Sequence, residues 1–400
     1  MKSMKKILAL TLAMLLLLSM AACSGSKPAE ASKATEAPAA NSNTGSSEKK
    51  AEAPKATTMN VYEHPVIKDS LKVGYMVQSK NSEATHRSLN QAAIEAAHRG
   101  WELVEVVYEE DNNFRDTFQN LVNQGVDAII VGSGSSQEAK ADLFRSARQA
   151  GIGVYCNDNQ VVDGIISNCT MPNGVAGMQL LYRIGEDYSW DLNICVIEGR
   201  NQQLMIERCD PAIALIESGA YPNLKLLSVQ DWTASGLSAA QSCYEIAQAW
   251  IQKYGEELDL IFTGADTFGV NSAEAVAQAG NDHIITCGID GGNRAFAYLR
   301  NGTAFKYSYS QPFELYTHNV FEIIYAIQVK GLEPGDPGCP ISKWGETVTF
   351  TGTITTAKDT LPIGAIIHEA FDYYDPTDTD AWYNWNDGPG VYTVQEWVKS

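Results

Sequence analysis

Three aspartates occupy similar positions in the sequence. Each one follows shortly after a short apolar run that predicts a buried strand. The three pairs of run and aspartate are 152–156 with Asp158, 258–262 with Asp266, and 284–289 with Asp290. Carboxylates accept hydrogen bonds from N–H and O–H groups. In open parallel sheets, ligands bind just outside the carboxyl ends of the strands. We therefore expect these side chains to contribute to a site for a polar ligand. The alternative for each is a helix cap or a turn residue.

The stretch 258–292 predicts the unit that positions two of these aspartates. A buried strand is followed by a helix of small residues, with Val270, Ala273 and Val276 spaced to face a core. Gly280 ends the helix, and a second buried run begins at Ile284. Two parallel strands joined by a helix form a βαβ unit, whose crossover is expected to be right-handed.

The same alternation of strand and helix occurs in two series along the chain. The expected strands are 71–77, 101–107, 126–131, 152–156 and 165–166 in the first series, and 193–198, 224–229, 258–262, 284–289 and 304–309 in the second. Helices are expected between them, and a long helix at 313–330 follows the second series. This pattern predicts an α/β fold with two doubly wound parallel sheets.

Composition and charge exclude several classes of function. The 400-residue chain has a formal net charge of −19, which disfavours nucleic acid and anionic membranes as partners. The loop 132–136 (GSGSS) matches neither the nucleophile elbow nor the dinucleotide fingerprint. The six histidines show no metal-ligand spacing, and the acidic segment 372–387 lacks the spacing of a calcium loop. We expect no enzymatic activity, no metal site and no cofactor.

The N-terminus has the pattern of an export signal. Three lysines precede the apolar run 7–20, and Ala21-Ala22-Cys23 follows it. A basic start, a short apolar run and small residues before a cysteine resemble a bacterial lipobox, although Met20 stands where leucine is usual. Residues 1–22 are thus expected to be a lipoprotein signal peptide and Cys23 the lipidated residue. The alternatives are an uncleaved anchor and a plain secretory signal. Residues 23–58 are rich in Ala, Ser, Lys, Glu and Pro, which predicts a disordered tether.

Seven cysteines remain beside Cys23. Three of them lie in predicted buried strands and behave there as small apolar residues (Cys156, Cys195 and Cys287). The other four leave room for a disulfide that sequence does not assign (Cys169, Cys209, Cys243 and Cys339).

Over roughly residues 70–360 the chain resembles type I periplasmic binding proteins, in the ribose- and galactose-binding branch of ABC transporter receptors. The matching pieces, in family order, are 124–130 (QGVDAII), 150–152 leading to Asp158, 262–266, 288–291 and Gln311-Pro312. The resemblance implies two lobes joined by a three-segment hinge that close on a ligand. It implies an N-terminal lobe of 59–171 plus 312–335 and a C-terminal lobe of 172–311 plus 345–358. A C-terminal extension, 359–400, has no counterpart in the family.

The resemblance also implies a set of ligand-binding residues. These are Asn81, Asp158, Asn159, Trp232, Asp266, Asp290 and Gln311. The chain departs from the family pattern in several places. Asn159 replaces an arginine, Ala265 an asparagine, and Ile206 a common ligand arginine. After Asn81, the usual Pro-Phe-Phe is replaced by Glu83-Ala84-Thr85. Arg208, two residues further on, is expected to form a salt bridge on its own helix. Trp232 is either a stacking platform for a sugar ring or a core residue.

The resulting expectation is a monomeric, extracytoplasmic, lipid-anchored receptor. It would capture a small polar ligand, a monosaccharide by resemblance, and deliver it to the membrane permease of an ABC transporter. Two alternatives stay open at this point. One is a sensor that signals to a membrane histidine kinase or chemoreceptor, and the other is a receptor for a different ligand such as a nucleoside. Repressors that share this fold are excluded by the export signal and by the lack of a DNA-binding headpiece.

Overall fold

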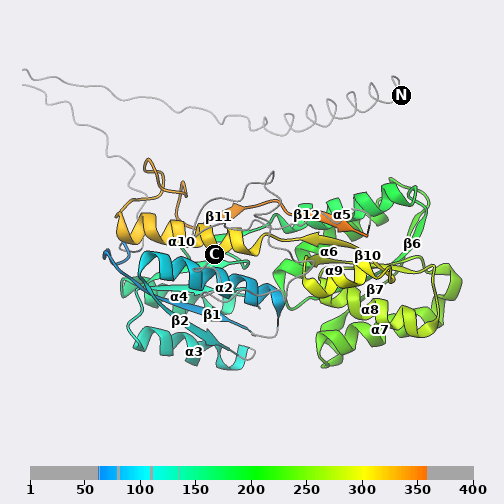
Figure 1. Ribbon diagram of the computed structural model, residues 1–400, viewed down its shortest axis with the longest axis horizontal. Coiled ribbons are helices and arrows are strands. Elements are labelled where there is room, and N and C mark those ends of the chain that lie inside the picture. Colours follow the sequence, from blue (N-terminus) through cyan, green and yellow to red (C-terminus); the bar gives the residue numbers. More distant parts are fainter. Residues whose placement is uncertain (1–61, 63, 79–81, 109–110, 135, 358–400) are drawn as a thin grey trace, which may run out of the picture. The chain divides into compact units, whose positions relative to one another are not determined.

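A computed structural model describes residues 62, 64–78, 82–108, 111–134 and 136–357 of the chain (Figure 1). All of these described residues belong to one compact unit. Cys23, Asn81, the expected tether and the C-terminal extension lie outside the described residues. Within the described ranges, every helix is too short or too polar to cross a membrane.

The first sheet has six strands, and all of its neighbouring strands are parallel. In spatial order they are β11 (Glu346–Thr349), β5 (Ser167–Thr170), β4 (Gly153–Asn157), β3 (Ala128–Val131), β1 (Lys72–Val77) and β2 (Glu102–Val107). The strands β1, β3 and β4 are mostly apolar because helices cover both faces of the sheet. One face carries α2 (Glu83–Arg99) and α10 (Phe313–Ile324), and the other carries α3 (Asp111–Asn123) and α4 (Ala141–Gln149).

The second sheet repeats this arrangement. Its spatial order is β12 (Thr353–Thr356), β10 (Phe305–Ser310), β9 (Ile285–Asp290), β8 (Leu260–Thr263), β6 (Leu192–Glu198) and β7 (Leu224–Asp231). β12 is antiparallel to β10, and the other pairs are parallel. The covering helices are α5 (Asn173–Asp187) and α6 (Gln203–Glu217) on one face, and α7 (Ala239–Tyr254), α8 (Asp266–Ala279) and α9 (Asn293–Arg300) on the other. The short helical turns are η1 (Glu138–Lys140), η2 (Trp232–Ser235), η3 (Gly255–Glu257) and η4 (Tyr325–Val329).

The chain passes between the two lobes at three places. It leaves the first sheet between β5 and α5, returns between β10 and α10, and crosses again between β11 and β12 (Figure 1). This confirms the prediction of two doubly wound parallel-sheet lobes joined by three segments. In each sheet the first five strands follow the order 2-1-3-4-5, so successive strands are added on opposite sides of the first strand, and the strand order reverses between the first and third strands. Ligand sites in such sheets lie at the carboxyl ends near this reversal.

One expectation about the last crossing is wrong. The resemblance implies that the whole of 345–358 belongs to the second lobe, whereas β11 extends the first sheet beside β5 and β12 joins the second. Gly352 lies between them, where a Cβ atom would be 1.9 Å from the carbonyl oxygen of Ser310. The chain therefore turns against the backbone of β10, a tertiary contact that strand propensity does not encode.

Three smaller differences have similar causes. The strand predicted at 165–166 begins at Ser167 and runs through polar residues to Thr170, so apolar content did not mark it. The long helix predicted at 313–330 is α-helical only to Ile324, and the wider turn η4 follows. The seven cysteines from Cys156 to Cys339 are all free, so the suggested disulfide among them does not form.

Candidate functional site

The carboxyl ends of the two sheets face a cavity of about 380 Å³ that is lined from both lobes. This volume lies within the range of about 300–1,000 Å³ that is usual for small-molecule sites. The first lobe contributes Tyr75 and Asp158, among others, and the second contributes Arg208, Trp232 and Asp290. The cavity therefore brings together side chains from distant parts of the sequence, at the edge where the strand pattern predicts them.

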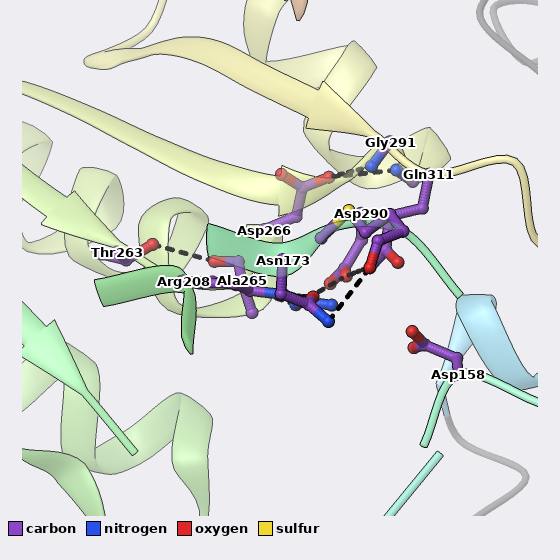
Figure 2. Close-up of polar contacts among 12 residues, drawn as sticks. Asp158, Asn173, Arg208, Thr263, Ala265, Asp266, Asp290, Gly291 and Gln311 are labelled. Atoms are coloured by element: carbon purple, nitrogen blue, oxygen red, sulfur yellow. Dashed lines mark hydrogen bonds and ion pairs between the residues drawn. The ribbon is translucent and has the colours of Figure 1, made fainter. Parts of the chain in front are cut away.

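Asp158 follows β4 and is buried at the cavity wall. Its carboxylate accepts a hydrogen bond from Thr170 Oγ1 at 2.9 Å. Burial raises the pKa of Asp158, and the positive charge of Arg208 opposes that rise. Figure 2 shows Asp158 facing Arg208 and Asp290 of the other lobe.

Asp290 and Arg208 form an ion pair on the opposite wall, with 3.5 Å between Asp290 Oδ1 and Arg208 Nη1 (Figure 2). Arg208 also donates from Nε to Asn173 Oδ1 at 2.8 Å and from Nη1 to the carbonyl of Gly264 at 3.0 Å. Within the described part of the chain, Arg208 Nη2 has no hydrogen-bond partner. Burial raises the pKa of Asp290 to about 6, while Arg208 acts to lower it. The pair thus offers a ligand both donors and acceptors.

The backbone is unusual at both cavity aspartates. Asp158 has a φ of +53° and Asp290 a φ of +152°, values that residues other than glycine rarely adopt. Such conformations are held only when surrounding contacts require them, and they often occur at ligand sites. Both aspartates are therefore held by the surrounding structure at the cavity wall.

Asp266 has a different place in the structure from the one predicted. It does not line the cavity, although its neighbours Ala265 and Thr267 do. Its Oδ2 accepts from the backbone N–H groups of Gly291 and Gly292 at 2.7 and 3.1 Å (Figure 2), and Ser308 Oγ donates to the same carboxylate. Burial and the nearby charge of Asp290 raise the pKa of Asp266 to about 7. Asp266 therefore braces the loop that carries Asp290.

Asn159 and Gln311 are also buried outside the cavity lining. Asn159 Nδ2 donates to the carbonyl of Gly132 at 2.7 Å, which ties two loops of the first lobe together. Gln311 Nε2 donates to Asp290 Oδ1 at 2.8 Å (Figure 2). Both side chains support the loops and side chains of the wall, because their polar atoms are used within the protein.

Aromatic rings form the apolar part of the cavity. Trp232 is half-buried in η2, and its ring centroid lies 5.7 Å from that of Phe268. Phe268 and Phe313 line the cavity with it. In the described part of the chain, Trp232 Nε1 is buried without a hydrogen-bond partner. Trp232 thus lines the cavity and also packs against the buried core of the second lobe.

Asn157 is one of the cavity residues that the sequence does not predict, and Arg208 lies in the cavity wall with a partner other than the expected one. Asn157 Nδ2 donates to Tyr75 Oη at 2.6 Å and to Thr317 Oγ1 at 2.7 Å, but its buried Oδ1 has no partner among the described residues. The salt bridge predicted for Arg208 on its own helix is wrong, because Arg208 pairs with Asp290 of β9. A signal existed for Arg208, since it lies on the buried face of α6 beside Leu204 and Cys209, where a charged residue is rare.

Comparison with known families gives an independent result. A model of the family described as "periplasmic binding protein domain" matches residues 73–328. The xylitol-binding protein of Mycolicibacterium smegmatis is 23% identical over 234 residues, which are 56% of this chain. The chain spans 62% of that relative's length, which is less than two thirds.

Solved structures share the fold at low sequence identity. A solute-binding protein of an ABC transporter from Agrobacterium vitis, with bound allitol, is 18% identical with a TM-score of 0.62, covering 72% of this chain and 96% of that one. The arabinose transporter component from Shewanella sp. ANA-3, bound to L-arabinofuranose, has the same identity and TM-score and covers 72% and 92%. A Bacillus halodurans protein with bound myo-inositol is 15% identical, with a TM-score of 0.60 and coverage of 73% and 96%.

Proposed function

Because this chain belongs to the periplasmic binding protein domain family, a family of solute-binding receptors and not of enzymes, we propose that it captures a neutral polyhydroxylated molecule between its two lobes for an ABC-type importer. The ligand class is a monosaccharide or a polyol. The observation that carries the proposal is the cavity wall on which Asp158 faces Arg208 and Asp290 beside aromatic rings.

The chemistry of this wall suits hydroxyl groups. A hydroxyl both donates and accepts, so it can donate to a carboxylate and accept from Arg208 Nη2 at the same time. Hydrogen bonds to charged groups contribute about 1.5–3 kcal/mol each. Trp232 and Phe268 offer surface to the C–H face of a sugar or polyol chain. The charged side chains of the lining are two aspartates and one arginine, a balance that disfavours an anionic ligand.

Names of similar proteins agree with this class. The xylitol-binding relative and the structures with allitol, L-arabinofuranose and myo-inositol all concern small neutral molecules that carry several hydroxyls. Their identities to this chain are 23% or lower, so they support a class of ligand and not one compound.

A thermal-shift screen tests the proposal. The purified protein is heated with xylitol, L-arabinose, D-ribose, myo-inositol, nucleosides and amino acids in parallel. A ligand at 100 times its Kd stabilises the folded state by about 2.7 kcal/mol, which raises Tm by roughly 2–4 °C. We expect a hit among the sugars or polyols that is lost in Asp158→Asn and Asp290→Asn and kept in the exposed control Asp282→Asn. A hit only among nucleosides or amino acids would overturn the ligand class.

The N-terminal segment supports a second part of the proposal, that Cys23 is acylated and holds the protein on the outer side of the cytoplasmic membrane. The support is the sequence pattern of three lysines, an apolar run and Ala-Ala-Cys. A single acyl chain binds membranes only weakly, so stable anchoring requires more than one. Cys23→Ser is expected to move the protein from the membrane fraction to the soluble fraction, and unchanged fractionation would refute the anchor.

A further inference from the structure

The start of α9 is capped from the other lobe. The residue before this helix, Gly292, has no side chain, so it cannot accept a hydrogen bond from the first N–H groups of the helix. The backbone N–H of Asn293 donates instead to both carboxylate oxygens of Glu83, at 2.7 and 2.8 Å. Glu83 is the first residue of α2 in the first lobe. A negative charge is favourable at a helix N-terminus, because the helix dipole is positive there.

The contact depends on close approach. A Cβ atom on Gly292 would lie 2.7 Å from Glu83 Oε2, so a larger residue there would push the carboxylate away. One turn further along α2, Arg87 donates to the carbonyls of Asp290 and Gln311 at 3.2 and 2.9 Å. Residues four apart lie on the same helix face. One face of α2 thus holds the loop that follows β9 in the second lobe.

Neither Glu83 nor Arg87 lines the cavity, but the loop that they contact carries Asp290, which does. We propose that Glu83 is a positioning residue that favours the closed arrangement of the lobes, because its carboxylate caps α9 across the lobe boundary without touching the ligand. The proposal rests on the proposed function for its link to affinity. When the lobes separate, the cap is lost, so Glu83 sets what fraction of the protein is closed. Apparent affinity is proportional to that fraction.

The test compares four purified variants with the wild type. Glu83→Ala removes the cap, Glu83→Gln keeps one acceptor oxygen, and Gly292→Ala obstructs the cap while leaving Glu83 in place. Glu274→Gln is the matched control: Glu274 Oε1 accepts from Arg294 of α9 at 2.6 Å, but both residues belong to the second lobe. Opening does not break this contact, so the control should behave as the wild type.

Two measurements are made on each variant. Small-angle X-ray scattering of the ligand-free protein is expected to give a larger radius of gyration for Glu83→Ala and Gly292→Ala than for the wild type, with Glu83→Gln between them. Stopped-flow measurements with xylitol as the probe are expected to show dissociation about 2- to 30-fold faster, the range for loss of a helix cap, with association little changed. A cap that served folding alone would lower Tm and leave the scattering and dissociation as in the wild type.

Different results would refute the proposed ligand class and the proposed role of Glu83. If xylitol and the other polyols do not bind the wild type, the ligand class is wrong, and the scattering comparison still decides the role of Glu83. If Glu83→Ala and Gly292→Ala scatter as the wild type does, the cap does not hold the lobes closed and the inference is refuted.

Discussion

Asp266→Asn is expected to make the protein more stable at alkaline pH, although it removes a carboxylate from the loop behind the cavity. The side chain is 6% exposed, and its pKa is raised from 3.8 to about 7 by burial and by Asp290. A carboxyl whose pKa is higher in the folded state than in the unfolded state favours folding while it is protonated. That contribution is complete below pH 3.8 and is lost as the pH rises towards 7.

The magnitude follows from the two pKa values. A pKa difference of one corresponds to about 1.4 kcal/mol, so a rise from 3.8 to about 7 corresponds to roughly 4 kcal/mol in total. Between pH 5 and pH 8 the wild type should lose on the order of 2–3 kcal/mol through this group alone. Asparagine stays neutral and avoids this loss.

Asparagine also fits the contacts of Asp266. Oδ2 accepts from the N–H groups of Gly291 and Gly292, and Ser308 Oγ lies within hydrogen-bond distance of both Oδ1 and Oδ2. An amide oxygen can take the place of Oδ2, and its NH₂ group can donate to the hydroxyl of Ser308. The substitution therefore leaves no buried polar atom of this group without a partner.

Urea unfolding of the ligand-free protein at pH 5 and pH 8 measures the effect. The unfolding free energy of Asp266→Asn minus that of the wild type should grow by about 2–3 kcal/mol from pH 5 to pH 8. Asp282→Asn, made at an exposed position, controls for the substitution itself. A difference that is the same at both pH values would refute the assignment of a raised pKa to Asp266.

Two further outcomes are expected. Gly177→Ala should destabilise the protein by about 1–3 kcal/mol in urea unfolding, because its Cβ would lie 2.0 Å from the backbone oxygen of Arg208. Gly174→Ala is its matched control on the same helix, where the nearest atoms are 3.5 Å away, and an equal loss there would contradict the packing argument. Trp232→Ala should weaken binding of the ligand found in the screen by roughly 2- to 12-fold, as expected for one aromatic contact, in calorimetric titration. Unchanged affinity would mean that the ring is only part of the core.

Much of the fold could be predicted from local pattern. Buried parallel strands have largely apolar sequences because helices cover both faces, and this pattern predicts β1, β3, β4, β6, β8 and β9 with small errors at their ends. The pattern does not predict the bounds of β5 (SNCT) or β11 (ETVT), because both strands have mainly polar sequences. Which sheet edge β11 joins depends on the path around Gly352 and Ser310.

The candidate site, like the fold, could be predicted only in part from the sequence. The ends of β4 and β9 could be located from sequence, and Asp158 and Asp290 do line the cavity. Asp266 stands at an equivalent strand end, but its side chain turns to the loop amides of Gly291 and Gly292 instead.

The strand and helix periods of the sequence, which are local properties of the chain, are enough to predict an α/β fold with two sheets and the edge of each sheet at which polar side chains gather. Tertiary packing determines which of those side chains face the cavity, that Arg208 pairs with Asp290, and that Glu83 caps α9. These depend on contacts between residues far apart in the chain, up to 210 positions for Glu83 and Asn293. No local period encodes such contacts, since they form only when the elements of one lobe, or the two lobes, are packed together.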